Sequence, residues 1–127
     1  MQKHSTQNTD RFKPRKVTVE NDKQYLSIHW ADGHHSVYSF EGLRGNCPCV
    51  FCRGGHDKMG QPFELALYMQ KPQRPRKIAK IDQVGHYAIQ IQWDDGHNSG
   101  IYKWEQLRTS CPVENGLIDA DEYERVR

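Results

Sequence analysis

The amino-acid sequence predicts an α+β fold: a mostly antiparallel sheet with short helices on one face, built from two repeated strand-hairpin-helix units. The first observation behind this prediction is an internal repeat, in which residues 26–48 resemble residues 89–112. The second is the alternation of apolar and polar residues that opens each unit, and the third is the helical spacing of apolar residues that closes it.

The repeat aligns when Gly100 is treated as a one-residue insertion in the second unit. Two short segments do not match so closely by chance, so the chain uses one supersecondary unit twice. The identical pairs are Trp30 and Trp93, Asp32-Gly33-His34 and Asp95-Gly96-His97, Ser36 and Ser99, Tyr38 and Tyr102, Glu41 and Glu105, Leu43-Arg44 and Leu107-Arg108, and Cys47-Pro48 and Cys111-Pro112.

Each unit contains a predicted β-hairpin. Apolar and polar residues alternate over 26–30 and again over 89–93, as in half-buried strands. An Asp-Gly pair follows in both units and predicts a tight turn, since glycine tolerates a positive φ. The return strands are expected near 36–39 and 99–102.

A short helix is predicted to follow each hairpin, because apolar residues recur at helical spacing over about 40–46 and 104–110. Upstream strands at 17–19 and 78–81 precede the hairpins. One unit alone cannot bury its apolar face, so the two units are expected to pack together as one domain.

The domain is expected to span residues 15–113. Residues 1–14 are predicted to be a disordered tail, and residues 114–127 a polar C-terminal tail. Between the units, the segment 61–70 has patterns of both strand and helix, and the sequence does not decide between them. Residues 71–76 are expected to be an extended linker.

Composition excludes several classes of function. The chain has 127 residues, 35% of them hydrophobic, and a net charge of +2. No apolar run is long enough to span a membrane, and the first residues lack the apolar region of a signal peptide. We therefore expect a cytoplasmic protein with no membrane partner. The nearly balanced charge likewise predicts no nucleic-acid partner.

The sharpest chemical feature is the segment Cys47-Pro-Cys-Val-Phe-Cys52, just after the first predicted helix. The gap between Cys49 and Cys52 lets a turn point both sulfurs at one ion. Pro48 keeps Cys47 from continuing the helix, which can swing a third sulfur inward. Three soft thiolates suit tetrahedral zinc, so we predict a Zn²⁺ site, with iron as the alternative metal. Two alternatives involve no metal: a redox-active C-x-x-C motif or a cluster of inert thiols.

A closed zinc site needs a fourth ligand, and the candidates are His34, His35, His56, His97 and Cys111. His56 lies soon after the cysteines. His97 lies on the second hairpin turn, which can approach the helix end of the other unit. Spacing alone does not choose between them. Cys111, at helical spacing, is expected in the core, and His34 is expected to be a turn residue.

The strings W-x-D-G-H-x-S and L-R-x-x-C-P-C-x-x-C-R make the sequence recognisable. From about Lys16 to Pro112 it resembles the N-terminal domain of γ-butyrobetaine hydroxylase, a family also called DUF971. The resemblance implies a zinc-bearing accessory module whose ligands match Cys47, Cys49, Cys52 and His97. It favours His97 over His56.

The resemblance also implies a function. The oxygenase needs two histidines and a carboxylate, usually begun by H-x-D, and this pattern is absent. We therefore expect a module that is non-catalytic alone and binds a protein partner. Some family members resemble extensions of iron–sulfur scaffold ATPases, which suggests a role in iron–sulfur cluster assembly. The alternatives are a cysteine-based redox or iron-binding protein, or the partner subunit of a non-haem iron oxygenase.

Other repeated residues receive structural roles. Trp30 and Trp93 end equivalent strands and are expected in the core. Arg44 and Arg108 recur in both predicted helices, and each is expected to pair with a carboxylate of the chain rather than bind an anion. The candidate carboxylates are Asp32, Asp95, Glu41 and Glu105.

Overall fold

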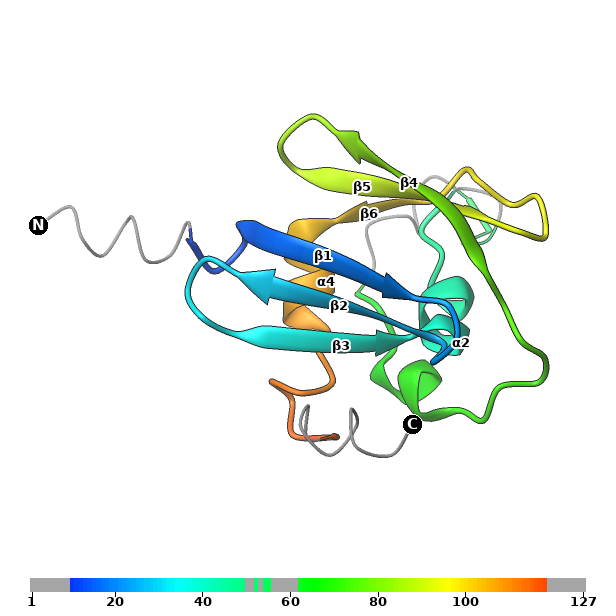
Figure 1. Ribbon diagram of the computed structural model, residues 1–127, viewed down its shortest axis with the longest axis horizontal. Helices are drawn as coiled ribbons and strands as arrows, with labels where there is room; N and C mark the ends of the chain where they lie inside the picture. Colours follow the sequence, from blue (N-terminus) through cyan, green and yellow to red (C-terminus); the bar gives the residue numbers. More distant parts are fainter. Residues whose placement is uncertain (1–9, 50–51, 53, 56–61, 119–127) are drawn as a thin grey trace, which may run out of the picture.

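The structure is a computed structural model, and it describes residues 10–49, 52, 54–55 and 62–118. Within this part of the chain, the strands form two antiparallel three-stranded sheets (Figure 1). The first sheet has the order β1-β2-β3 and the second β4-β5-β6. The strands are β1 Pro14–Glu20, β2 Tyr25–Trp30, β3 His35–Ser39, β4 Ile78–Val84, β5 Ala88–Trp93 and β6 Ile101–Lys103.

A short helix follows each sheet, α2 over Phe40–Gly45 and α4 over Trp104–Thr109. The side chain of Ser39 caps α2 by accepting a hydrogen bond from the backbone N–H of Gly42. The predicted α+β class and the two strand-hairpin-helix units are therefore confirmed. The segment that the sequence left open contains a 3₁₀ helix, η2, over Leu65–Met69.

The sequence suggested one sheet, and the structure has two. The two units associate through helices and sheet faces, and none of the described edge strands pairs with a strand of the other unit. One contiguous core contains residues of both units, among them the predicted Trp30 and Trp93. No helix in the described part of the chain is long and apolar enough to cross a membrane.

The two units are joined by reciprocal contacts, as in a pseudo-two-fold arrangement. The hydroxyl of Tyr38 donates to the carbonyl of Leu107 (2.5 Å), and that of Tyr102 donates to the carbonyl of Leu43 (2.6 Å). Each of these tyrosines thus holds the helix of the other unit. Ring pairs repeat the pattern, since Phe40 meets Trp93 edge-on and Trp30 meets Trp104 edge-on.

The two repeated arginines also reach across the units. Arg44 pairs with Asp95 at 3.2 Å, and Arg108 pairs with Asp32 at 2.9 Å. Each arginine comes from a helix, and each aspartate from the hairpin turn of the other unit. The predicted intramolecular ion pairs are therefore confirmed, and their arrangement brings each hairpin turn to the helix end of the other unit.

Candidate metal centre

The cysteine segment begins where α2 ends. Asn46 caps this helix, and its side chain exchanges two hydrogen bonds with the backbone of Glu64, at 2.8 and 3.1 Å. These bonds fix the start of the segment against the connection between the units. The side chains of Cys47 and Cys49 are buried there, whereas that of Cys52 is exposed.

His97 approaches from the other unit, on the loop between β5 and β6. The Asp-Gly pair that precedes it makes the predicted turn, in which Gly96 has a φ of +89°. The carboxylate of Asp95 accepts a hydrogen bond from the backbone N–H of His97 at 2.9 Å. The turn therefore fixes the backbone from which the imidazole of His97 points toward the cysteines.

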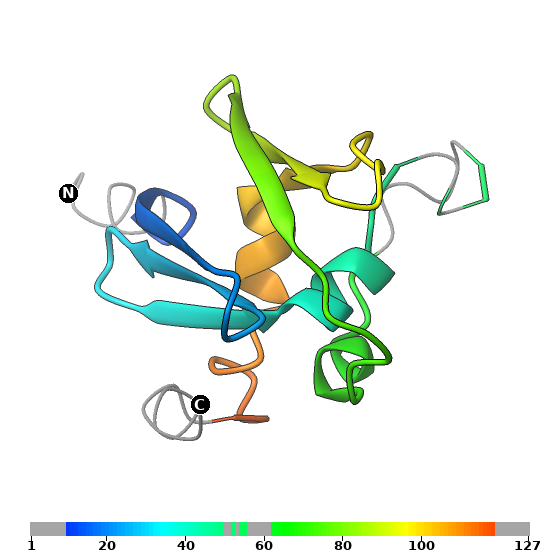
Figure 2. The ribbon, with the colours of Figure 1, turned by 45° about the vertical axis from the view of Figure 1, so that its right-hand side comes forward.

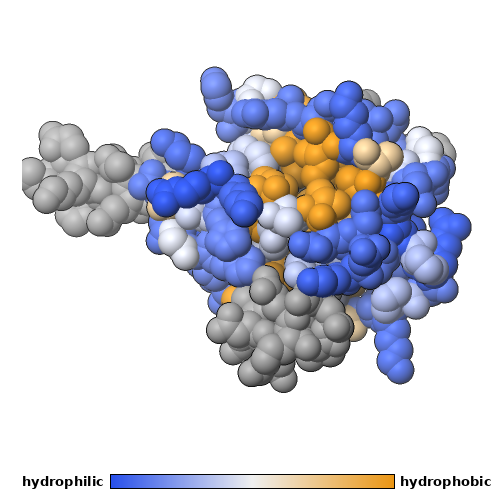
Figure 3. Space-filling model, in the orientation of Figure 1, coloured by the Kyte–Doolittle hydropathy of each residue, from blue (hydrophilic) through white to orange (hydrophobic). Residues whose placement is uncertain are grey.

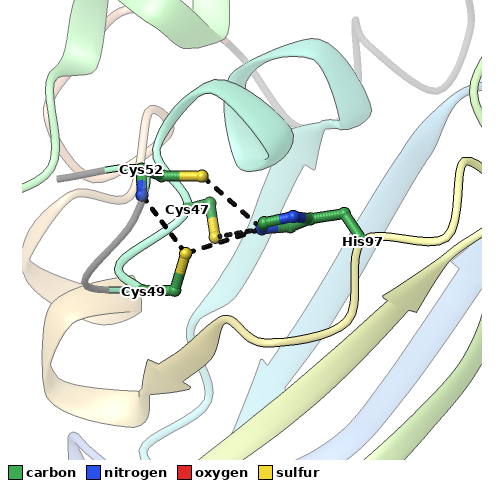
Figure 4. A group of neighbouring side chains, drawn as sticks. All are labelled: Cys47, Cys49, Cys52 and His97. Atoms are coloured by element: carbon green, nitrogen blue, oxygen red, sulfur yellow. Dashed lines mark hydrogen bonds between the residues drawn. The ribbon is translucent and has the colours of Figure 1, made fainter. Parts of the chain in front are cut away.

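Four side chains converge at this junction (Figure 4). The Sγ atoms of Cys47, Cys49 and Cys52 lie 3.1, 3.6 and 3.5 Å from Nε2 of His97. All four of these atoms lie within 4.8 Å of one another. Around tetrahedral zinc, with bonds of about 2.3 Å to sulfur and about 2.0 Å to nitrogen, sulfur and nitrogen are about 3.5 Å apart. The group could therefore hold a metal ion.

The buried thiols differ in how readily they ionise. Burial raises the pKa of Cys47 to about 12. Burial also disfavours the thiolate of Cys49. Hydrogen bonds with the Ser99 hydroxyl, the backbone N–H of Cys52 and the two neighbouring thiols outweigh this effect and lower the pKa of Cys49 to about 6. Because a thiol must lose its proton to bind a metal, Cys49 is the buried thiol that is best prepared as a ligand.

Arg44 lies beside the cluster without being one of the four candidate ligands. Its guanidinium lies 3.9 Å from the sulfur of Cys52 and 3.2 Å from the carboxylate of Asp95, which holds the backbone of His97. Three thiolates around a divalent ion would leave one net negative charge, which this cation would partly offset. Burial works against the charge on Arg44, but Asp95 and, to a smaller extent, Cys52 more than compensate and raise the pKa of the guanidinium.

Gly100 is a residue whose role the sequence analysis missed. A Cβ at this position would lie 2.7 Å from the sulfur of Cys47 and 3.3 Å from the ring of Pro48. The inserted residue therefore has to be glycine for the loop to pass beside the cluster. The sequence did offer a signal for this role, because Gly100 is the one-residue insertion that follows the turn carrying the candidate ligand His97.

Ser99 was also missed as a member of the site. In the first unit its repeat mate Ser36 accepts a hydrogen bond from the indole of Trp30. In the second unit the loop is one residue longer. The side chain of Trp93 forms a hydrogen bond with Tyr102 rather than with the serine, and the hydroxyl of Ser99 forms one with the thiol of Cys49. The one-residue insertion thus gives the second serine to the thiol cluster.

The other fourth-ligand candidates lie elsewhere or outside the described residues. His34 reaches Cys111, with 3.3 Å between Nε2 and Sγ, so it does more than form a turn. Cys111 is fully buried, as predicted. His35 stacks on His29. His56 lies outside the described residues.

The family model described as "Gamma-butyrobetaine hydroxylase-like, N-terminal" matches residues 17–108. The chain belongs to this family. The family is a non-catalytic type of domain, and the match covers the first repeated unit and most of the second. The comparison with curated proteins gives no match.

Solved structures agree with this assignment. A DUF971-family protein of unknown function from Acidithiobacillus ferrooxidans is 32% identical, with 80% of this chain and 94% of that chain covered and a TM-score of 0.59. A structure determined by NMR is 25% identical over 90% of this chain and 78% of that one, with a TM-score of 0.63. A second NMR structure, 19% identical over 90% and 82% of the two chains with a TM-score of 0.56, supports the fold alone.

Proposed function

We propose that this protein is a zinc-binding accessory module that is non-catalytic by itself and acts on a protein partner. The observation that carries the proposal is the convergence of Cys47, Cys49, Cys52 and His97 from two separate units. Three thiolates and one imidazole form a closed tetrahedral set that leaves no open position for a substrate, as in structural zinc sites.

Zinc is favoured over iron by the donors, because a mixed shell of three sulfurs and one nitrogen is common for structural zinc. The partner role draws support from the family description, which places such domains at the N-terminal end of a longer, hydroxylase-like protein. The resemblance favours a component of iron–sulfur cluster assembly as the class of partner, as an analogy between family members.

The deciding experiment is metal analysis of the full chain purified without added metal. We expect about one zinc per chain. One iron per chain would replace zinc with iron in the proposal, and no bound metal in freshly purified, reduced protein would refute the metal site. Turnover of 2-oxoglutarate by the chain alone would refute the non-catalytic role.

Thiol labelling separates the module from a cysteine-based redox protein. In the zinc-bound chain, the three clustered thiols should react slowly, and zinc should leave as they react. Rapid modification of Cys49 or Cys52 with zinc retained would favour the redox function instead.

A further inference from the structure

The strands β1 and β4 are open edges that lie beside each other without pairing. Within the described part of the chain, β1 pairs only with β2, and β4 only with β5. At one end the edges are tied together by Asn21, whose side chain donates to the carbonyl of Ile78 at 3.3 Å and accepts from its N–H at 2.9 Å. From this tie the two sheets diverge in a V (Figure 2).

The opening between the two edges has an apolar floor. Val17 and Ile81 are partly buried and pack on the core, and the buried side chains of Ile89 and Trp104 line the same cleft. Two adjoining clefts of 290 and 760 Å³ share Pro14, Gln83 and Trp104 in their walls. Figure 3 shows an apolar patch on the surface between β1 and β4.

The rim of this opening is basic. Four cationic side chains line the two clefts, and the only carboxylate among the lining residues is that of Glu105. None of the four cations has an ion-pair partner among the described residues. These cations are Lys13, Arg15, Lys16 and Lys103. The surface thus combines unpaired backbone groups, an apolar floor and positive charge.

We propose that this opening, which we call the edge groove, binds an extended acidic segment of a partner protein that adds as a strand to β1. Backbone groups of β1 would supply hydrogen bonds, and alternate side chains of the segment would enter the apolar floor. The remaining side chains would meet the basic rim, which favours aspartate and glutamate. The inference rests on the proposed partner role and identifies the surface that performs it.

Basic residues on an edge strand also serve to prevent association between sheets. That role explains the charges of Arg15 and Lys16 but not the apolar floor, which is left open between two edges. The two explanations make opposite predictions, because a purely protective edge repels every strand, whereas the edge groove accepts an acidic one.

The test uses the zinc-bound full chain and a fluorescent heptapeptide that alternates valine with glutamate or aspartate. The control peptide carries lysine in place of the acidic residues. We expect saturable binding of the acidic peptide alone, with NMR shifts concentrated in the backbone amides of β1 and β4. Lys16→Glu should weaken binding about tenfold, since one attraction becomes a repulsion. The matched Lys23→Glu, an exposed position outside the groove, should bind as the wild type does.

Equal binding of both peptides, shifts away from the groove, or no binding at millimolar peptide would overturn the inference. The inference would also be overturned if single-stranded RNA shifted the same amide signals while the acidic peptide did not. Zinc content is measured on the same samples. Zinc-bound protein that does not bind the peptide refutes the proposed role of the edge groove and leaves the metal site intact. Protein that binds the peptide at β1 but holds no metal when freshly purified and reduced refutes the metal site and leaves the groove intact.

Discussion

His97 and His34 occupy equivalent turns, yet they meet different surroundings. His97 faces three sulfurs, whereas His34 faces the single sulfur of Cys111. The reason lies in the sequence after the second helix, where Val113 and Gly116 stand in the places that Cys49 and Cys52 hold in the first unit. The repeat thus provides a natural control for the metal site.

The first prediction compares these two histidines. His97→Ala should remove one of four ligands and lower zinc affinity by more than the roughly 10- to 100-fold typical of losing an outer-shell partner. His34→Ala should leave the zinc content at the wild-type level. Competition with a zinc chelator measures both affinities. Zinc retained by His97→Ala, or lost from His34→Ala, would contradict the proposed ligand set.

The second prediction concerns pH. The Cys49 pKa of about 6 lies below the ordinary value of 9, so its ionisation stabilises the zinc-free fold above pH 9, and this contribution is lost as the pH falls through 6. Ser99→Ala removes a hydrogen bond to the thiolate and should raise the pKa of Cys49, so that the contribution becomes smaller and is fully lost at a higher pH. Titration of thiolate absorbance in reduced, zinc-free protein measures the change.

The control for this titration is Ser36→Ala, the repeat-equivalent change. Ser36 bonds to Trp30 and lies in the first sheet, so its loss should affect stability but leave the lowest thiol pKa unchanged. A titration that Ser99→Ala does not move would remove Ser99 from the site.

At the scale of elements, α2 positions the cysteine segment, and η2 holds α2. A Cβ on Gly42 would lie 2.6 Å from the Cα of Tyr68, which is backbone and cannot turn aside. A Cβ on Gly45, in the same helix, would meet only the Leu67 side chain at an ordinary 3.4 Å. The two glycines therefore differ in how closely they approach η2.

The third prediction follows from this difference. Gly42→Ala should force α2 and η2 apart and lower the free energy of unfolding by about 1–3 kcal/mol, the usual cost of overpacking. Gly45→Ala should be neutral or raise it by up to about 1 kcal/mol through helix propensity. Urea denaturation of both zinc-bound variants measures the two effects. Equal effects would mean that the contact between α2 and η2 does not constrain the helix.

The elements also show how far the sequence could predict the structure. Both helices were predicted to within a residue or two, because the same apolar spacing occurs twice in the repeat. The 3₁₀ helix at Leu65–Met69 has no repeat mate, and its alternating apolar residues suit more than one structure. The separation of the strands into two sheets depends on tertiary packing, which local patterns do not encode.

The residues of the candidate site also differ in how far the sequence could predict them. Cys47, Cys49 and Cys52 stand together in the sequence, so their spacing alone indicated a metal. His97 was one of several candidates, and only the family resemblance favoured it. The repeat predicted that Arg44 pairs with a carboxylate. The contacts of Arg44 with Cys52 and of Ser99 with Cys49 depend on partners brought together by the fold, and no local pattern predicted them.

At the scale of the whole molecule, the cluster lies on a junction that is already closed by packing. Reciprocal tyrosine, arginine and aromatic contacts join the units, and a single core runs through both. Small zinc fingers unfold without their metal because they have little else to hold them. This chain differs, because its hydrophobic core contains residues of both units and includes none of the four candidate ligands.

The last prediction is therefore that zinc stabilises this protein without being required for its fold. The ion would bridge Cys52 and His97, which are 45 residues apart. Closing a loop of this length is worth about 4 kcal/mol in the chain-entropy model. Chelation should lower the melting temperature clearly, while far-ultraviolet circular dichroism at low temperature remains that of the zinc-bound protein and unfolding remains cooperative.

The control for chelation is the His97→Ala variant, which has already lost the bridge between the units. Adding chelator to it should change its melting temperature little, because any metal left on the three cysteines closes only a short local loop. Chelated wild-type protein with the circular dichroism of an unfolded chain would show that the core does not hold without metal. An unchanged melting temperature would show instead that the ion does not connect the two units, and the cluster would then be a local feature of the segment after α2.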